Sequence, residues 1–294
     1  MIKVKNSKET RPTIQELLYQ APDLLKSIAP QEAVARLRVL LCFILNINRT
    51  ELFTRLTDRL TIKESELFLS SIKRLQNHEP IQYITGQQEF YGRTFLVNKN
   101  VLIPRPETEE LVALFRTTYP QNVHATVVDL GTGSGAIAIT LALECPNLKL
   151  IAVDKSLTAL KQAKVNAKRH QVQERITFYQ GNFLAPVNEQ ADVILSNPPY
   201  ISTEELATLP KHVRNFEPKL ALAGGRSGLA AYHTILDQIT KLSYKPNLVL
   251  LEIGMTQGEQ VTAIITAALP MYSCKVKKDL SGKERFIMLE KNTS

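Results

Sequence analysis

Apolar residues follow two different spacing patterns along the chain, and the first of them is typical of helices. Thr13-Ile-Gln-Glu16 matches a capping box that opens a helix, and Pro30 is placed to start a second helix that runs through Leu45. Residues 61–77 hold a third amphipathic pattern. The pattern predicts a small helical bundle at residues 1–80.

The second pattern extends over residues 107–294, where buried strands alternate with helices. Strands are expected at residues 125–129, 149–154, 176–180, 192–195, 248–253, 272–278 and 285–289. Helices are expected at residues 107–118, 136–144, 156–170, 228–242 and 256–268. This order predicts a mostly parallel sheet covered on both faces. The last two strands have only a short turn between them, so they should form an antiparallel hairpin at one end of the sheet.

Between these regions, residues 88–97 form two short β-prone runs on either side of Gly92, which is consistent with a hairpin. We assign residues 81–106 to a linker that carries this hairpin.

Composition narrows the class of protein. With 294 residues, 44% of them hydrophobic and 22% charged, the chain fits one large or two ordinary globular domains. Residues 1–10 are too polar for a signal peptide, and the longest apolar run, Val39–Leu45, is too short to span a bilayer. The three cysteines are widely separated and the five histidines show no ligand-like spacing. We therefore expect a reduced cytoplasmic protein and no metal site.

The net charge of +8 raises the question of a nucleic-acid partner. Residues 1–100 contain 15 lysines and arginines against 10 acidic residues, and the remainder contains 21 against 18. No tract of five or more basic residues occurs. A solvated surface with a basic bias is favoured, while weak attraction to an RNA-rich partner stays open.

The strongest chemical signal is Asn197-Pro198-Pro199-Tyr200, directly after an expected buried strand. Two prolines fix two φ angles and remove two backbone donors, so the carbonyls of this turn face outward with few local partners. The Asn amide could form hydrogen bonds with a planar NH2 group, and the Tyr ring could pack on its plane. Such a group is either a carboxamide or the exocyclic amine of adenine or cytosine. The alternative is an ordinary turn that ends a strand.

A second signal lies between the first strand and its helix, where Gly131, Gly133 and Gly135 alternate with other residues. Such a loop lets a ligand approach the backbone closely, although a tight turn would use the same glycines. The Gly-x-Gly-x-Gly spacing departs from the dinucleotide fingerprint. It therefore favours a loop that packs against a nucleoside over one that binds a pyrophosphate. Asp154, about 20 residues further on, is placed to accept hydrogen bonds from ribose hydroxyls; the alternative is that Asp154 or Ser156 caps the next helix. Asn182-Phe183, after the third strand, could contact an adenine.

These motifs occupy the carboxyl ends of successive strands, which is where open α/β sheets bind ligands. Their order resembles a class I S-adenosylmethionine-dependent methyltransferase, with Asn-Pro-Pro-Tyr as the amino-methyltransferase signature. Further segments are similar to the bacterial HemK/PrmC family of peptide-chain release factor glutamine methyltransferases: Glu79–Gly86, Phe90–Gly92, Leu102–Glu109, Asp129–Gly135, Ser196–Ile201, Glu217-Pro218 and Gly224-Gly225. The segment Ile103-Pro-Arg-Pro-Glu-Thr-Glu109 is the most discriminating of these.

The resemblance implies a Rossmann-like, seven-stranded α/β methyltransferase domain at residues 107–294 and a helical amino-terminal domain that helps to engage the release factor. It implies S-adenosylmethionine as methyl donor, S-adenosylhomocysteine as product, and the glutamine of the Gly-Gly-Gln loop as acceptor. We expect a monomer without direct nucleic-acid or membrane partners. The expected cofactor residues are Asp129, Gly131, Thr132, Gly133, Ser134, Gly135, Asp154, Asn182, Phe183 and Asn197. Family members commonly carry Asp where this chain has Asn182.

The expected substrate residues are Asn197, Pro198, Pro199, Tyr200 and Arg105. As a mechanism, the Asn197 side chain and the Pro198 carbonyl would accept hydrogen bonds from the substrate NH2, while Tyr200 packs on the amide plane. Arg105 would either reach the substrate or organise the junction between the domains. Glu107 and Glu109 could form a carboxylate pair, but as residues of a first helical turn they are favoured there by the helix dipole.

Two other functions remain open. An adenine amino-methyltransferase acting on DNA or RNA would need the same grip on a planar NH2, together with a target-recognition domain or a concentrated basic surface. Neither feature is visible in the sequence. A non-catalytic, ribosome-associated module would have no need of an intact Asn-Pro-Pro-Tyr turn.

Overall fold

The computed structural model describes residues 11–119 and 123–292. Residues 1–10, on which the expectation of no signal peptide rests, lie outside this part. The chain divides into two compact units, residues 1–86 and residues 87–294, which we call the bundle and the sheet unit. Within the described ranges, no helix has both the length and the apolar character needed to cross a bilayer.

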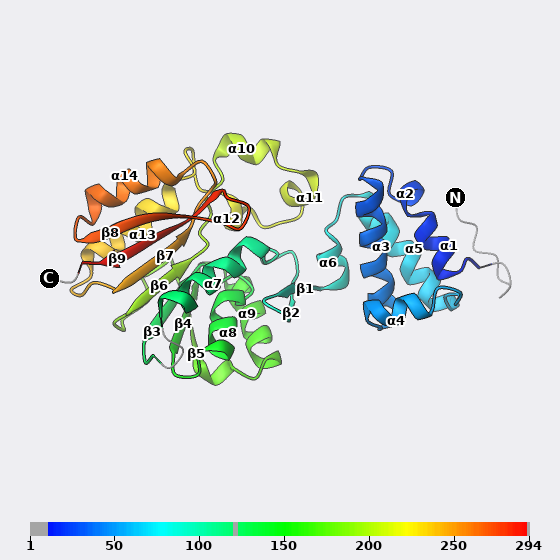
Figure 1. The fold of residues 1–294 in the computed structure, drawn as a ribbon, viewed down its shortest axis with the longest axis horizontal. Helices are drawn as coiled ribbons and strands as arrows, with labels where there is room; N and C mark the ends of the chain where they lie inside the picture. Colours follow the sequence, from blue (N-terminus) through cyan, green and yellow to red (C-terminus); the bar gives the residue numbers. More distant parts are fainter. Residues whose placement is uncertain (1–10, 120–122, 293–294) are drawn as a thin grey trace. The chain divides into compact units, whose positions relative to one another are not determined.

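The bundle is helical, as predicted. Its helices are α1 (Ile14–Tyr19), α2 (Ala21–Leu24), α3 (Pro30–Leu45), α4 (Arg49–Thr54), α5 (Ile62–Gln76) and α6 (Ile81–Thr85) (Figure 1). The expected capping box is present, because the Glu16 backbone N–H donates to the Thr13 hydroxyl at 3.2 Å and the Thr13 N–H donates to the Glu16 carboxylate at 2.7 Å. The apolar stripe of α3 packs against α5 and forms the core of this unit. Helices α2, α4 and α6 were not expected.

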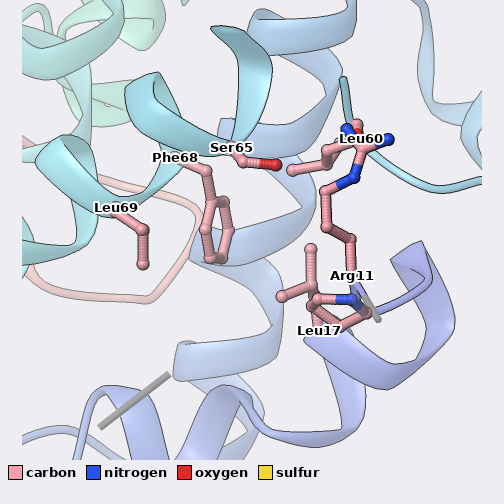
Figure 2. Close-up of a pocket in the computed structure, with 7 residues that line it drawn as sticks. Arg11, Leu17, Leu60, Ser65, Phe68 and Leu69 are labelled. Carbon is pink, nitrogen blue, oxygen red and sulfur yellow. The ribbon is translucent and has the colours of Figure 1, made fainter. Parts of the chain in front are cut away.

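A small cavity of about 20 Å³ lies inside the bundle between α1 and α5. Figure 2 shows the apolar side chains of Leu17, Leu60 and Phe68 around it, with Arg11 at its edge. Arg11 is buried and donates a hydrogen bond of 2.5 Å to the Leu60 carbonyl. Because this volume holds about one water molecule, the cavity is a packing gap and not a ligand site.

The sheet unit contains the predicted seven-stranded sheet, in the order β5-β4-β3-β6-β7-β9-β8 (Figure 1). The strands are β3 (Thr126–Leu130), β4 (Lys149–Asp154), β5 (Ile176–Gln180), β6 (Val193–Ser196), β7 (Leu248–Glu252), β8 (Tyr272–Lys278) and β9 (Glu284–Lys291). The first five strands in the spatial order are parallel, and β9 pairs antiparallel with both of its neighbours. The predicted α/β fold class is confirmed, including the antiparallel hairpin at one end of the sheet.

Helices cover both faces of the sheet because alternate strand residues point to opposite faces. One core cluster takes Leu248 and Leu250 of β7 with residues of α7 (Pro106–Thr118), α8 (Ala136–Glu144) and α9 (Leu157–Arg169). The other takes Val249 and Leu251 with residues of α13 (Ala230–Lys241) and α14 (Gly258–Ala268). Four further short helices, η2 (Gln173–Arg175), α10 (Thr203–Thr208), α11 (Lys211–Arg214) and α12 (Lys219–Leu222), were not expected.

The hairpin, β1 (Gln87–Phe90) and β2 (Arg93–Leu96), belongs to the sheet unit and not to a separate linker. Positive φ angles at Tyr91 (52°) and Gly92 (71°) give the backbone of a type I′ turn. Phe90 and Phe95 are fully buried in the sheet-unit core, which attaches the hairpin to that unit. The division after Gly86 therefore splits the expected linker at residues 81–106, because α6 packs with the bundle.

Candidate active site

A cleft of about 360 Å³ lies at the carboxyl ends of the parallel strands of the sheet unit. Six of the residues expected from the sequence to hold cofactor line it, namely Gly131, Gly133, Asp154, Asn182, Phe183 and Asn197. Pro199 lines it as well. Residues that sequence reasoning did not anticipate complete the walls: Asn100–Leu102, Lys155, Ser156, Ala159, Gly181, Pro218, Leu220, Ala221, Ala223, Ala230, Ala231 and Thr234.

The glycine loop presents bare backbone to this cleft. Gly131 and Gly133 have φ angles of 74° and 56°, a left-handed conformation that other residues adopt only with strain. The backbone N–H groups of Gly131 and Thr132 both donate to the Val153 carbonyl, at 2.8 and 2.9 Å, which ties the loop to β4. Gly135 serves a different purpose, because a Cβ there would lie 2.7 Å from Ile139 Cδ1 of α8 and 3.2 Å from Ala163 Cβ of α9. It allows α8 to start close to the neighbouring helix.

Asp154 lies beside the loop with acceptor capacity to spare. Its Oδ2 accepts the Gly133 N–H at 2.9 Å and its Oδ1 accepts the Ser156 N–H at 2.8 Å. Each carboxylate oxygen can accept a further hydrogen bond. Burial raises the pKa of this carboxyl, while the two N–H donors partly offset the shift. The Ser156 hydroxyl accepts the Ala159 N–H and caps α9, so of the two cap candidates in the sequence, Asp154 and Ser156, it is Ser156 that makes the cap.

Asp129 lies beneath the loop, fully buried and away from the cleft lining. Its Oδ2 accepts from the Thr132 hydroxyl at 2.6 Å and from the Ala138 N–H at 3.2 Å. Its Oδ1 has no hydrogen-bond partner among the described residues. Burial raises the pKa of Asp129 to about 7. Thr132 and Ser134 are also buried and do not line the cleft, so they shape the loop from behind.

A buried side chain that sequence reasoning missed, Asn166 of α9, holds the glycine loop from the other side. It donates to the Ser134 carbonyl at 2.8 Å and exchanges hydrogen bonds with the backbone N–H and C=O of Leu96 in the hairpin. The hairpin therefore supports the cofactor side of the cleft. No sequence signal separates this Asn from a solvated helix residue.

Asn182 and Phe183 occupy the turn after β5. Phe183 has a φ of 54°, which is strained for a bulky residue. The Gln238 side chain of α13 stabilises the turn, because it donates to the Asn182 carbonyl at 3.0 Å and accepts the Leu184 N–H at 2.8 Å. The turn thus holds the Phe183 ring among the residues that line the cleft.

The Asn-Pro-Pro-Tyr turn begins at the end of β6. The Asn197 side chain donates to the Thr108 hydroxyl at 2.9 Å, and Pro198 is buried. Burial, reinforced by the nearby charge of Glu252, raises the pKa of Tyr200 to about 12. Tyr200 therefore keeps its proton at neutral pH and is unsuited to act as a general base.

Gly224, Gly228 and Gln257 contact the backbone of this turn. A Cβ at Gly224 would lie 2.8 Å from the Pro199 carbonyl oxygen, and one at Gly228 would lie 2.4 Å from that of Tyr200. Gln257 donates to the Tyr200 carbonyl at 3.0 Å. The close approach explains why glycine is required at both positions, and Gln257 is a support that sequence reasoning missed.

Thr108 and Glu252 form the wall behind Asn197. The Thr108 hydroxyl donates to Glu252 Oε2 at 2.7 Å, and both residues are buried. Burial raises the pKa of Glu252 to about 7. Sequence reasoning named neither residue. The usable signals were the place of Thr108 inside Ile103–Glu109 and that of Glu252 at the end of a predicted strand.

Arg105 is engaged within the sheet unit. Its guanidinium contacts Glu217 Oε1 at 2.6 Å, and Glu217 Oε2 accepts the Ile103 N–H at 3.2 Å. The Glu217 side chain is fully buried whereas that of Arg105 is 32% exposed. This ion pair ties the start of α7 to the segment that closes one side of the cleft. Glu109 lies in the first turn of α7, as predicted, and accepts the Tyr91 N–H at 2.9 Å.

Comparisons with known proteins agree with this architecture. The family model described as PrmC N-terminal domain matches residues 16–86, and the one described as Methyltransferase small domain matches residues 108–216. A crystal structure of a methyltransferase from Pyrococcus furiosus aligns with a TM-score of 0.51 at 16% identity, over 79% of this chain and all of that one. At this identity the likeness shows the fold alone.

Sequence relatives cover nearly the whole chain. The release factor glutamine methyltransferase of Bacillus cereus is 40% identical over 260 residues, which are 86% of this chain and 90% of the relative. That of Bacillus subtilis is 39% identical over 289 residues, which are 95% of this chain and 99% of the relative.

Proposed function

The chain belongs to the family of release factor glutamine methyltransferases, and we propose that it transfers a methyl group from S-adenosylmethionine to the glutamine side chain in the Gly-Gly-Gln loop of a peptide-chain release factor. The observation that carries this proposal is Asn197, an amide held by a buried hydroxyl at the edge of a cofactor-sized cleft. An amide in this place can recognise another amide by complementary hydrogen bonds.

The residues of the cleft fit S-adenosylmethionine. Its volume of about 360 Å³ lies in the range of small-molecule sites. Asp154 retains acceptor capacity for ribose hydroxyls, Gly131 and Gly133 offer close backbone approach, and Phe183 offers a ring beside an adenine. Asp129 Oδ1, which has no partner in the described part of the chain, leaves a buried polar atom under the loop. When bound, the cofactor supplies an electrophilic methyl group and departs as S-adenosylhomocysteine.

The residues of the protein must then orient the substrate nitrogen, which is a weak nucleophile, toward the methyl group. A carboxamide nitrogen is a poor nucleophile because its lone pair is delocalised into the carbonyl. We assign to the Asn197 side-chain oxygen and the Pro198 carbonyl the hydrogen bonds that orient the substrate NH2. Holding reacting atoms at about 3 to 3.5 Å removes several kcal/mol of barrier. Tyr200 packs on the amide plane and excludes water, and no base is needed in advance because the alkylated nitrogen is acidic.

The bundle is assigned to recognition of the release factor. Its residues 16–86 match the PrmC N-terminal domain, and its exposed apolar side chains include Tyr19 and Phe53. Arg105, which the sequence suggested for substrate contact, is assigned to holding Glu217. A cytoplasmic monomer without direct nucleic-acid or membrane partners stays a prediction.

The test uses methyl-labelled S-adenosylmethionine with three acceptors, namely a release factor, the same factor with its Gly-Gly-Gln glutamine replaced by alanine, and nucleic acid. We expect label only on the intact release factor, located on the glutamine by peptide mass spectrometry. Label confined to nucleic acid would support the adenine methyltransferase alternative and overturn the proposal. Absence of transfer to any acceptor, with cofactor binding intact, would support a non-catalytic module.

A further inference from the structure

Three polar side chains from separate parts of the chain form a line that runs from the cleft wall at Asn197 to the buried Thr108 and Glu252. Asn197 donates to Thr108 at 2.9 Å, and Thr108 donates to Glu252 at 2.7 Å. They come from the turn after β6, the first turn of α7 and the end of β7. Thr108 is 5% exposed and Glu252 is 2% exposed, so bulk water does not replace either partner.

The order of donors along this line has a chemical consequence. A hydroxyl has a single proton, and a carboxylate can only accept. Because the Thr108 hydroxyl already donates its single hydrogen bond to Glu252, its oxygen can only accept from Asn197. The Asn197 NH2 group must therefore face Thr108, which leaves its Oδ1 as the atom free for another group. The two ends of an amide have nearly the same shape, so packing alone would not select this orientation.

We propose that Thr108 and Glu252 are positioning residues that hold the Asn197 amide with its oxygen, and not its NH2, turned toward the acceptor amide. This inference rests on the proposed function and deepens it. The substrate NH2 needs an acceptor, and a reversed Asn197 would set one donor against another. The pair thus makes the site specific for an NH2-bearing acceptor.

The ionisation of Glu252 controls the direction of the line. As a carboxylate it accepts from Thr108; as a carboxylic acid it can donate instead, and Thr108 can then donate to Asn197 and favour the reversed amide. Its pKa of about 7 places this change near neutrality. The titratable and charged groups that face Glu252 are Arg105 and Glu107 at the start of α7, Tyr200 after β6, Tyr232 on α13 and Arg285 on β9.

The first test removes the hydroxyl and keeps the shape. Thr108→Val should lower kcat for release-factor methylation about tenfold, the factor associated with one lost hydrogen bond, while Kd for S-adenosylmethionine stays within about twofold. Thr108→Ser, which keeps the hydroxyl, should recover most of the rate. Thr140→Val is the matched control, because Thr140 is equally buried and its hydroxyl has no partner in the described structure.

The second test is the pH profile. The kcat of the unmodified chain should fall about tenfold per unit as pH drops well below the pKa of Glu252, whereas Glu252→Gln should show no such acid limb because its amide does not titrate. This comparison decides the matter even where Thr108→Val fails to fold. Equal rates for Thr108→Val and Thr140→Val, or an acid limb that survives in Glu252→Gln, overturns the inference. If the unmodified chain does not methylate the release factor, the proposed function is overturned instead.

Discussion

The two sides of the cleft are built in different ways. We call the glycine loop with Asp154 the cofactor side, and residues 197–200 with their supports the amide side. On the cofactor side, Gly131 and Gly133 are held by β4 through the Val153 carbonyl and the Asp154 carboxylate. The donors are backbone N–H groups of the loop, and only the Gly133 bond also needs a side chain, the Asp154 carboxylate.

The amide side depends on bonds from side chains far apart in the chain. Asn197 and Thr108 are 89 residues apart, Thr108 and Glu252 are 144 apart, and Gln257 and Tyr200 are 57 apart. Each bond needs a particular functional group at each end. The cofactor side is therefore held mainly through the backbone of its loop, with Asn166 as a distant side-chain support. The amide side is an assembly of side chains from across the folded sheet. Changes on the first should alter binding, and changes on the second should alter turnover.

We expect the largest difference between turnover and cofactor binding in Asn197→Ala. Loss of the amide that orients the acceptor should lower kcat about 100-fold. Kd for S-adenosylmethionine, measured by calorimetry, should change by no more than about threefold, because the cofactor side is held independently. Asn188→Ala, an exposed asparagine outside the cleft lining, serves as control. Wild-type turnover in Asn197→Ala would contradict the assignment.

Gly228→Ala should disturb the amide side through packing. Its Cβ would lie 2.4 Å from the Tyr200 carbonyl oxygen at a φ of 78°. Gly282 has a φ of 79° with nothing within 4 Å of its Cβ position, so Gly282→Ala isolates the cost of the backbone conformation. We expect that variant to lose about 1 to 2 kcal/mol of unfolding free energy.

For Gly228→Ala we expect a loss of roughly 3 to 4 kcal/mol and about tenfold lower kcat, since the clash adds to the same backbone cost. Denaturant unfolding and initial rates measure the two effects. Equal losses in Gly228→Ala and Gly282→Ala would show that the turn moves aside without penalty.

Asp154→Asn tests the cofactor side. An amide accepts the ribose hydroxyls less strongly than a carboxylate, so Kd for S-adenosylmethionine should rise about tenfold. Saturating cofactor should restore kcat to within about twofold. Asp237→Asn, an exposed position of α13, is the control. A fall in kcat that saturating cofactor does not relieve would mean that the two sides are coupled.

The smallest effect is a pH dependence of stability that both sides share. Burial raises the pKa of Asp129, under the cofactor side, and of Glu252, on the amide side, to about 7 from ordinary values of 3.8 and 4.5. The folded chain binds these protons more tightly than the unfolded chain. Their contribution to stability is therefore present at low pH and is lost as pH rises from about 4 to 7.

Denaturant unfolding at pH 5 and pH 8 measures this loss. Glu252→Gln and Asp129→Asn should each lose less unfolding free energy over the interval than the unmodified chain, by on the order of 1 to 3 kcal/mol. Glu204→Gln, at an exposed position, should behave like the unmodified chain. If all four lose stability equally, neither buried carboxyl has a raised pKa in the folded protein.

Sequence patterns predicted the elements that hold the cofactor side almost to the residue. The strands at 149–154 and 176–180 and the helix at 136–144 match the structure, because their apolar content and the adjoining Gly135 and Gly181 are local properties. The short helices α10, α11 and α12 were not predicted, since segments of four to six residues carry little periodicity. The hairpin was predicted, but its attachment to the sheet unit depends on buried Phe90 and Phe95.

The α/β order, the glycine loop, the place of Asp154 and the Asn-Pro-Pro-Tyr turn could all be predicted, because each follows from residues close together in the chain. The folded arrangement was needed to show that Thr108 and Glu252 stand behind Asn197 and that Arg105 pairs with buried Glu217. It also separated residues that line the cleft, such as Gly133, from those that support it from behind, such as Ser134. Side-chain contacts across a hundred residues arise from strand order and helix packing, which no local pattern encodes.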